Sequence, residues 1–406
     1  MAIRHLSFDQ IDEAQLRGLI AGQASESREI EYKSDVYGKS DKDIAEFLAD
    51  ISSFANTVGG DIFIGISAKE GIPTDLAPLG VDCDAEIVRL ESIARSGLQP
   101  RIHGLESRKV PLSDGGAVII VRVPKSYAQP HRLIRNGTGH NRFYARSSAG
   151  KYEPNVDELR LLFAAAPQLA ARIRDLRFER IARIAANDGF VPLSRHPILT
   201  LHIVPFTTFD LRLDFPLKQN SDTFLNFPFL NTEENGICSI NFDGLLIVDY
   251  KYSNRPNSTY VQIYKTGIVE SVLSHLHQPN EKTKEIFPLS AKAIEYQIAK
   301  CSHRYIDSLM KFGFRAPFAI LVSIIGVKGI GYSFSSNNDY GFGSGGGKFD
   351  RDQFHFSEII IESLSSDRVH HAEQIRPLFD QIANAANQEN SPSFDRAGRS
   401  IGKWSD

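Results

Sequence analysis

Three consecutive pieces of sequence decide the fold of the first part of this chain: ESREIEYK (26–33), SDKDIAEFLADISSFANTVGG (40–60) and DIFIGI (61–66). The first piece ends in alternating apolar and charged residues, which predicts a strand with one core face and one charged face. In the second piece, Ser40 and Asp43 form a capping-box start, and the apolar residues that follow recur at helical spacing. The third piece is a short apolar run bounded by glycines, which predicts a buried strand behind the helix.

Further elements follow along the first region. We predict a short N-terminal helix within residues 1–22, a helix at Ala85–Ser96, a strand at Gly115–Pro124 and a hairpin around Asn136-Gly137. A helix at Val156–Phe163 is expected to close this domain. Gly65, inside the predicted strand at 61–66, indicates a close approach of another backbone segment.

The second region, from residue 191 onward, has a different sequence pattern. Its apolar runs LTLHIVPF, GLLIVDY, STYVQIY, AILVSIIGV and FHFSEIIIES predict strands, and helices are expected at Ala291–Phe312 and Ala372–Ala386. The fold class expected for the chain is therefore α+β, with a mostly antiparallel second domain. The expected segments are 1–22 (N-terminal helix), 23–165 (first domain), 166–190 (Arg-rich linker helix), 191–386 (α+β domain) and 387–406 (loose polar tail).

Composition places the chain among ordinary globular proteins. Of its 406 residues, 42% are apolar and 23% are charged, and no apolar run is long enough for a membrane helix. The N-terminal stretch has no apolar segment of the kind found in signal or transit peptides, so we expect a cytoplasmic protein. Cys83, Cys238 and Cys301 lie far apart, which favours isolated reduced thiols over disulfides or a zinc site.

Charge is unevenly distributed, although the net charge is only −3. Residues 115–152 contain seven Lys/Arg, two His and no Asp/Glu, whereas the preceding part of the chain is acidic. Aromatic residues alternate with the cations in this segment, a mixture typical of surfaces that hold phosphates and stack bases. A solvated hairpin is the alternative. The candidate nucleic-acid-binding residues are Arg122, Lys125, Arg132, Arg135, Arg142 and Arg146.

A second candidate site lies in ESREIEYK. Glu26, Glu31 and Lys33 offer two carboxylates for a divalent ion and one cation for a phosphate group. Five residues along a straight strand would point the two glutamates to opposite faces, so Glu26 must precede the strand if the two are to meet. The alternative is a solvated charged face of a strand.

The ordered set of motifs resembles a known family. ESREIEYK, SSFANTVGGDIFIGI, GAVIIVRVP and NRFYARSS are similar to the AlbA-like domain of the Schlafen family and its bacterial relatives. The resemblance covers residues 20–163, a little over a third of the chain. It implies an AlbA-like fold for this part of the chain and a nucleic acid, in particular RNA, as its partner.

The resemblance also implies a metal-dependent chemistry. Nucleolytic Schlafens cut tRNA and rRNA with a divalent metal held by the two acids of the motif and a third acid after the glycine-containing strand. Glu26 and Glu31 match the first two acids, with Mg²⁺ or Mn²⁺ as the expected ion. The third position is Ala68 in this chain. Glu70 or Asp61 would have to complete the metal site.

The glycine-rich stretch DYGFGSGGGKFD (339–350) satisfies a GxGxxG spacing but lacks the strand and helix context of a dinucleotide site, and Phe349 follows Lys348 where a P-loop has Ser or Thr. A loop between two strands is the better interpretation. An ATP-binding protein is therefore the weakest of the functions considered.

Two functions from different classes are compatible with the sequence. The first is a metal-dependent endoribonuclease acting on tRNA-like structured RNA, in bacterial stress or antiphage defence. The second is a non-catalytic DNA- or RNA-binding regulator with the same fold. Because the resembling proteins place two lobes around RNA and this chain has one set of motifs, we also expect a homodimer.

Overall fold

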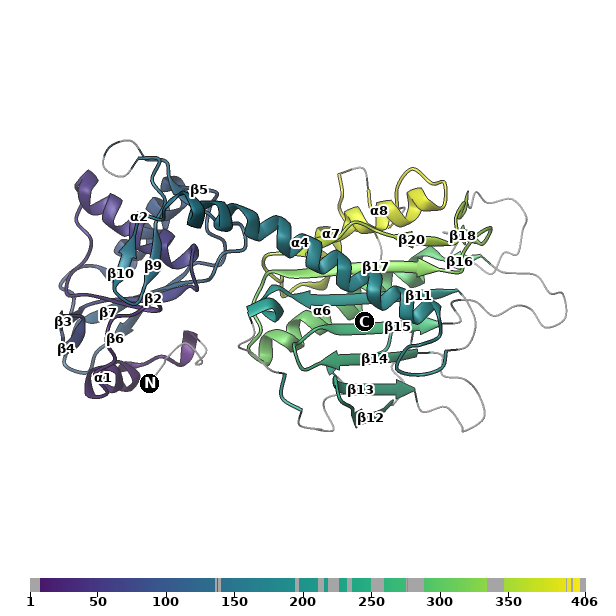
Figure 1. Ribbon diagram of the computed structural model, residues 1–406, viewed down its shortest axis with the longest axis horizontal. Helices are drawn as coiled ribbons and strands as arrows, with labels where there is room; N and C mark the ends of the chain where they lie inside the picture. Colours follow the sequence, from purple (N-terminus) through teal and green to yellow (C-terminus); the bar gives the residue numbers. More distant parts are fainter. Residues whose placement is uncertain are drawn as a thin grey trace. The chain divides into compact units, whose positions relative to one another are not determined.

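The structure, a computed structural model, divides the chain into two compact units, Met1–Ala171 and Arg172–Asp406 (Figure 1). The boundary lies within one helix, α4 (Val156–Ala185). The residues that the structure describes are 8–135, 137, 140–193, 197–210, 215–217, 226–231, 236–249, 259–274, 276, 288–333, 347–391, 393–395 and 397–401.

A four-stranded sheet with the strand order β1-β2-β7-β6 organises the N-terminal unit. β1 and β2 are parallel, and the other two pairs are antiparallel. The bounds of these strands are β1 Ile30–Lys33, β2 Gly60–Ile64, β6 Glu106–Pro111 and β7 Ala117–Val123. The strands predicted at the motif ESREIEYK, at DIFIGI and at 115–124 are thus confirmed.

Each face of this sheet packs on a separate core. On one face, α2 (Asp41–Ala55) and α3 (Cys83–Gly97) cover Ile62, Ile64 and their neighbours. On the other face, α1 (Glu13–Ala21) packs its Leu16 and Leu19 against a core that includes Tyr32 and Phe63. The alternation of side chains along β1 and β2 therefore decides which residues enter which core.

Helix α2 forms as predicted. The Ser40 hydroxyl accepts a hydrogen bond from the Asp43 amide at 3.2 Å, and the Asp43 carboxylate accepts one from the Ser40 amide at 3.2 Å, which completes the capping box. The apolar stripe is buried throughout, as expected. After α2, Gly60 lies so close to Phe54 that a Cβ there would be 2.1 Å from the ring, so only glycine fits.

Smaller pairs of strands complete the unit. β3 and β4 form a hairpin after β2, β5 pairs with β8, and β9 pairs with β10. Their bounds are β3 Ile66–Lys69, β4 Ile72–Leu76, β5 Leu98–Gln99, β8 Arg132–Leu133, β9 Ala145–Ser147 and β10 Gly150–Tyr152. The hairpin predicted around Asn136-Gly137 lies partly outside the described residues. Gly65 has a φ of +106° and lies against Ala77, the close approach that the sequence predicted.

The C-terminal unit contains an eight-stranded antiparallel sheet (Figure 1). The strand order is β12-β13-β14-β15-β11-β17-β20, and β21 also pairs with β17. The bounds are β11 Ile198–Pro205, β12 Gly236–Ile240, β13 Gly244–Asp249, β14 Thr259–Tyr264, β15 Val269–Ser274, β17 Phe318–Ile325, β20 Gln353–His355 and β21 Ile359–Ile361. Three further short strands, β16 Leu289–Ser290, β18 Gly331–Ser333 and β19 Gly347–Lys348, form a small sheet. The expected α+β class is confirmed.

Helices cover both faces of the large sheet. α6 (Ala291–Lys311), α7 (Arg368–Gln374) and α8 (Arg376–Ala385) contribute to the larger apolar core. Ile181 and Ile184 of α4 belong to a separate core. This core also contains strand residues that point to the other face of the sheet, among them Ile198, Tyr260, Val272 and Ile325. The helix predicted at 372–386 is in fact two helices that meet at Ile375.

Two sequence expectations for connecting segments need correction. The closing helix at Val156–Phe163 and the Arg-rich linker helix at 166–190 form one continuous helix, α4, with Pro167 inside it. The polar tail is not loose throughout, because Ser391 and Ser393 are buried and both donate hydrogen bonds to Glu295. Polar side chains in the tail find a buried acceptor, which composition alone does not reveal.

The remaining structural expectations concern thiols, membranes and the glycine-rich loop. Cys83, Cys238 and Cys301 are free. Among the described residues, no helix is both long and apolar enough to cross a membrane. Most of the glycine-rich stretch at 339–350 lies outside the described residues.

Candidate functional site

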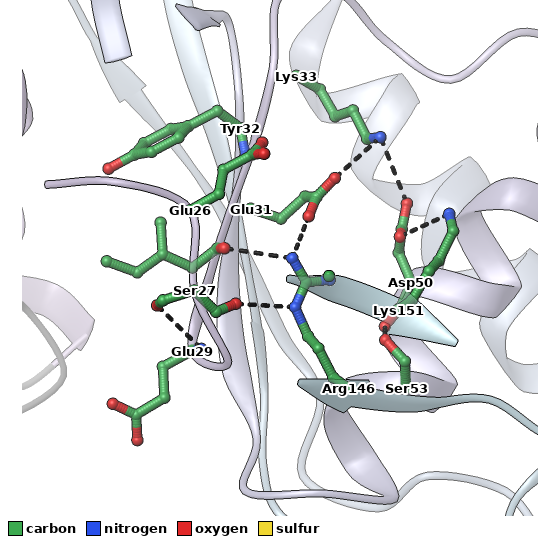
Figure 2. A network of polar contacts seen from close by, with 12 residues as sticks. Glu26, Ser27, Glu29, Glu31, Tyr32, Lys33, Asp50, Ser53, Arg146 and Lys151 are labelled. Atoms are coloured by element: carbon green, nitrogen blue, oxygen red, sulfur yellow. Dashed lines mark hydrogen bonds and ion pairs between the residues drawn. The ribbon is translucent and has the colours of Figure 1, made fainter. Parts of the chain in front are cut away.

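The charged face of β1 points toward α2. Glu31 and Lys33 alternate with Ile30 and Tyr32, and Tyr32 stacks on Phe63 in the core beneath the other face. Figure 2 shows Glu31 and Lys33 beside side chains from α2, β9 and β10. One strand therefore contributes both to a core and to a cluster of charges, which we call the β1 cluster: Glu26, Glu31, Lys33, Glu46, Asp50, Arg146 and Lys151.

Glu31 is paired with two cations. Its carboxylate accepts from the Arg146 guanidinium and from the Lys33 ammonium, the latter at 3.1 Å (Figure 2). Burial raises the pKa of Glu31, but Arg146 and Lys33 outweigh this and hold the pKa below its usual value. Glu31 is therefore an ionised acid neutralised within the protein.

Arg146 is almost fully buried. Besides Glu31, its guanidinium donates to the Ser27 carbonyl at 2.9 Å and the Ile30 carbonyl at 3.3 Å, and lies 4.2 Å from the centroid of the Phe54 ring. The sequence predicted that Arg146 would bind nucleic acid. The structure corrects this, because the side chain is held inside the unit and connects β9 to β1.

Lys33 lies among three carboxylates. Its ammonium is 2.8 Å from Glu46, 3.1 Å from Glu31 and 3.6 Å from Asp50. Burial lowers the pKa of Lys33, but these carboxylates outweigh it and raise the pKa above its usual value. The ammonium is thus charged and occupied by internal partners, although 23% of the side chain stays exposed.

Asp50 is a buried acid of the β1 cluster that the sequence analysis did not identify. Its carboxylate is 1% exposed and accepts from Lys151 at 2.8 Å and from the Tyr37 hydroxyl at 2.9 Å. Burial and then Asp50 raise the pKa of Tyr37. A signal was available in the sequence, because Asp50 occupies the same helical stripe as Phe47 and Phe54, where an apolar residue is expected.

Glu26 precedes β1, as the sequence required for a shared site. One carboxylate oxygen accepts from the Tyr32 amide at 3.1 Å, and the Glu26 amide donates to the Gly71 carbonyl at 2.6 Å. Burial, and next the charge of Glu31, raise the pKa of Glu26 above its usual value. Figure 2 shows Glu26 and Glu31 within the same group of polar side chains.

Asp61 does not join these acids. It pairs with Ile30 in the β1–β2 register, and both carboxylate oxygens accept from Arg122, at 2.8 Å each. Both side chains are buried on the sheet face opposite Glu31. Two expectations are corrected here, Asp61 as a metal ligand and Arg122 as a nucleic-acid contact, because strand alternation turns them away from the β1 cluster.

The β3–β4 hairpin carries Glu70, the remaining candidate for the third acid of a metal site. Glu70 is exposed at the turn, with a φ of +51°. The ladder shifts register between Ser67 and Ala68, but the additional residue, Thr74, is on β4. No group of three or more His, Cys, Asp or Glu side chains able to hold a metal ion is found in the part of the chain that the structure describes.

The remaining predicted cations lie on the surface. Arg142 pairs with Glu153 at 2.5 Å with 55% of its side chain exposed, and Arg135 lies 3.5 Å from Asp41. Arg132 donates to Gln99 at 2.8 Å and to Asn141 at 3.1 Å. Lys125 lies 5.4 Å from the centroid of the Tyr127 ring. Exposed pairs of this kind are worth about 1 kcal/mol or less, so a phosphate can replace the acid.

The arginines of the Arg-rich helix α4 are partly internal. Arg180 donates to both oxygens of Glu270, at 2.8 and 3.0 Å, and Arg177 donates to the Phe356 carbonyl at 2.6 Å. Both are buried in the C-terminal unit. Burial lowers the pKa of Arg180. The hydrogen bonds and charge of Glu270 outweigh burial, so the pKa of Arg180 is raised above its usual value.

Comparison with known proteins agrees with this arrangement. Residues 26–155, which include β1, α2, β2, β7 and the segment that supplies Arg146, match the family model of the Schlafen AlbA_2 domain. This part of the chain is a Schlafen AlbA_2 domain. The match supports a nucleic-acid-binding role for the Schlafen AlbA_2 domain and covers 26–155 alone. No curated protein is detectably similar to the chain.

Two solved structures are similar over part of the chain. The DIP2311 protein from Corynebacterium diphtheriae is 15% identical over 35% of this chain and 26% of its own, with a TM-score of 0.24. The N-terminal domain of a putative ATP-dependent DNA helicase RecG-related protein from Nitrosomonas europaea is 19% identical over 36% of this chain and 94% of its own, with a TM-score of 0.26. The present chain thus spans about a quarter of the DIP2311 protein.

Proposed function

We propose that the Schlafen AlbA_2 domain binds nucleic acid through the surface arginines Arg132, Arg135 and Arg142. The observation that supports this most is the division of the acid-free segment 115–152. Arg122 and Arg146 are buried with Asp61 and Glu31, whereas Arg135 and Arg142 are exposed and Arg132 is half-buried. Cations kept at the surface in a segment without acids are suited to phosphate contacts.

The β1 cluster supports binding without cleavage. Glu31 and Asp50 each face a cation supplied by β9 or β10, so their charges stabilise the fold of the domain. A catalytic metal needs carboxylate oxygens that are available to it. In the present arrangement Arg146 and Lys33 occupy those of Glu31.

A metal-dependent endoribonuclease is the second candidate. It is favoured by the position of Glu26, whose raised pKa reflects burial and the nearby charge of Glu31. Mg²⁺ or Mn²⁺ would be held by Glu26 and Glu31, with Glu70 as the remaining candidate third acid, and would stabilise the charge that develops on a scissile phosphate. The substrate would be tRNA-like structured RNA, and the setting stress or antiphage defence.

The proposal includes RNA over DNA as the partner and a homodimer as the working assembly, as the family resemblance implies. A dimer would present two copies of the surface formed by Arg132, Arg135 and Arg142, the arginine surface, around a two-fold axis. Light scattering of the free protein and of its complex with RNA measures this, and a monomer with full affinity would contradict it.

One set of measurements separates the two candidates. Purified protein is incubated with labelled total tRNA and with DNA of equal length, with Mn²⁺ or with EDTA, and both affinity and strand integrity are measured. Binding to RNA in EDTA with intact strands in Mn²⁺ supports the binding function. Mn²⁺-dependent cleavage that Glu31→Gln abolishes, with affinity unchanged, would establish the nuclease instead. Absence of binding to either nucleic acid contradicts both.

A further inference from the structure

An aromatic pair lies beside the arginine surface. The ring of Phe163, on the N-terminal part of α4, meets Phe143 with the centroids 5.7 Å apart and the planes at 75°. Phe163 is 57% exposed, and Phe143 is only half-buried. Both residues belong to the N-terminal unit.

The pair is connected to the cations through the backbone. Phe143 directly follows Arg142, and its backbone forms an isolated β-bridge with Arg132. Arg132 is held in place by Gln99 and Asn141. The backbone therefore places Arg132 and Arg142 next to Phe143, which meets the exposed ring of Phe163.

This combination has a specific binding chemistry. A ring that packs by its edge against another ring is fixed in orientation while much of its surface remains accessible. An unpaired base can stack on such a ring, and flanking arginines can hold the phosphates on either side of it. A base inside a duplex is already stacked on its neighbours, so it gains no comparable stacking energy from the ring.

We propose that Phe163, oriented by Phe143, is a stacking site for an unpaired base, and that Arg132 and Arg142 hold the adjacent phosphates. This rests on the proposed function and deepens it, because it assigns the ligand to single-stranded or looped nucleic acid. Regular duplex engages the arginines alone and binds more weakly.

The same helix offers a competing explanation. Val156 and Leu161 are 64% and 70% exposed, so the first turns of α4 display further apolar surface that a second copy of the chain could cover. The charge next to the aromatic pair favours a nucleic acid, since an interface between two copies would bring like-charged arginines together. Self-association of wild type and Phe163→Ala is therefore measured by light scattering alongside nucleic-acid binding.

The test uses the full chain and three variants: Phe163→Ala, Phe163→Trp and the control Leu161→Ala, which removes a more exposed apolar side chain from the same helix. Fluorescence anisotropy measures affinity for a short single strand and for the duplex of the same sequence. A second readout places 2-aminopurine in the single strand, because stacking on a ring quenches its fluorescence.

The expected result is selective. Phe163→Ala weakens single-strand binding by about 5- to 100-fold and removes the 2-aminopurine quenching, as expected for loss of one stacked base. Duplex binding is unchanged, Phe163→Trp retains both signals, and Leu161→Ala behaves as wild type. Because Phe163 is exposed, the variants are expected to unfold at the same urea concentration as wild type.

Other outcomes overturn the inference. Equal affinity of wild type for single strand and duplex, or equal losses for both in Phe163→Ala, leaves the arginine surface intact but refutes the stacking site. A Phe163→Ala protein that loses self-association and keeps its quenching assigns the ring to a protein interface. If wild type binds neither form, the proposed function itself fails.

Discussion

The guanidinium of Arg146 donates to the carboxylate of Glu31 across 115 positions of sequence, and the two side chains are 1% and 14% exposed. The pair joins β9 to β1 inside the Schlafen AlbA_2 domain. The pair also explains why Glu31 and Arg146, which the sequence analysis assigned to metal binding and nucleic-acid binding, are largely inaccessible to solvent in the structure.

Replacing Arg146 is expected to destabilise the domain strongly. Arg146→Ala leaves Glu31 and two backbone carbonyls without their donor, and breaking a buried ion pair costs about 3–5 kcal/mol. Urea unfolding measures the change in the free energy of unfolding. Arg142→Ala, which removes an exposed pair with Glu153, is the matched control and is expected to cost about 1 kcal/mol or less. Similar losses in both variants would contradict the internal role of Arg146.

Lys33 is expected to suppress divalent-cation binding. Its ammonium lies within 3.6 Å of Glu31, Glu46 and Asp50, so Lys33→Ala leaves three carboxylates with less compensating charge. A unit charge about 4 Å away contributes roughly 4 kcal/mol at the effective dielectric of a protein surface, so Mn²⁺ affinity should rise at least about tenfold.

The control for this prediction is Lys33→Arg, which keeps the positive charge and should not gain affinity. Isothermal titration with Mn²⁺ measures both variants and wild type. If Lys33→Ala binds no more Mn²⁺ than wild type, the three carboxylates are structural charges that cannot be converted into a metal site.

The salt dependence of RNA affinity is expected to show whether Arg132 and Arg142 contact phosphates. Each phosphate contact contributes roughly 0.7 to 0.9 to the slope of log affinity against log salt. Arg132→Ala combined with Arg142→Ala should therefore weaken RNA binding and lower the magnitude of the slope by about 1.5. Arg351→Ala, which removes an exposed arginine of the C-terminal unit, is the control. An unchanged slope in the double variant would place the binding surface elsewhere.

Glu295 is expected to make the C-terminal unit less stable as pH rises. Burial raises the pKa of Glu295 to about 7, even though Ser393, Ser391 and Tyr332 donate hydrogen bonds to its carboxylate. A carboxyl whose folded pKa exceeds its unfolded value favours the folded state when protonated, so its contribution is full below about 4.5 and is lost as pH rises to about 7.

The size of this effect is roughly 3 kcal/mol, because each pKa unit corresponds to about 1.4 kcal/mol. Glu295→Gln should remove it. The free energy of unfolding of wild type minus that of Glu295→Gln, measured from pH 5 to pH 8, should therefore fall with pH. A constant difference would show that Glu295 does not titrate in this range.

Much of the N-terminal fold could be predicted because its signals are local. The capping box of Ser40 and Asp43, the stripe on α2 and the alternation along β1 each depend on residues a few positions apart. Strand geometry gave only a condition for Glu26, that it must precede β1 to meet Glu31, and the structure meets this condition. The family match then confirmed the resemblance over residues 26–155.

The errors share a different physical origin. Arg122 and Arg146 were assigned to the surface because arginine is mostly exposed, but each has a buried acid as a partner far away in the sequence. Asp50 was missed although its place on the apolar stripe of α2 was a local signal, and its donor Lys151 lies 101 positions away. Side-chain pairing at such separations depends on the folded sheet, which composition and periodicity do not encode.

The last strands of the Schlafen AlbA_2 domain, β9 and β10, also set the timing of its maturation during translation. Asp50 leaves the ribosome long before Lys151, and at roughly 5–20 residues per second the 101 intervening positions take about 5–20 s to be made. Until then the carboxylate has only Lys33 and the Tyr37 hydroxyl as partners, and burial of an incompletely paired charge is unfavourable. The ion pairs of Glu31 and Asp50 are therefore completed only when the final hairpin has been made, and a chain released before that hairpin would lack Arg146 and Lys151 as partners for these two acids.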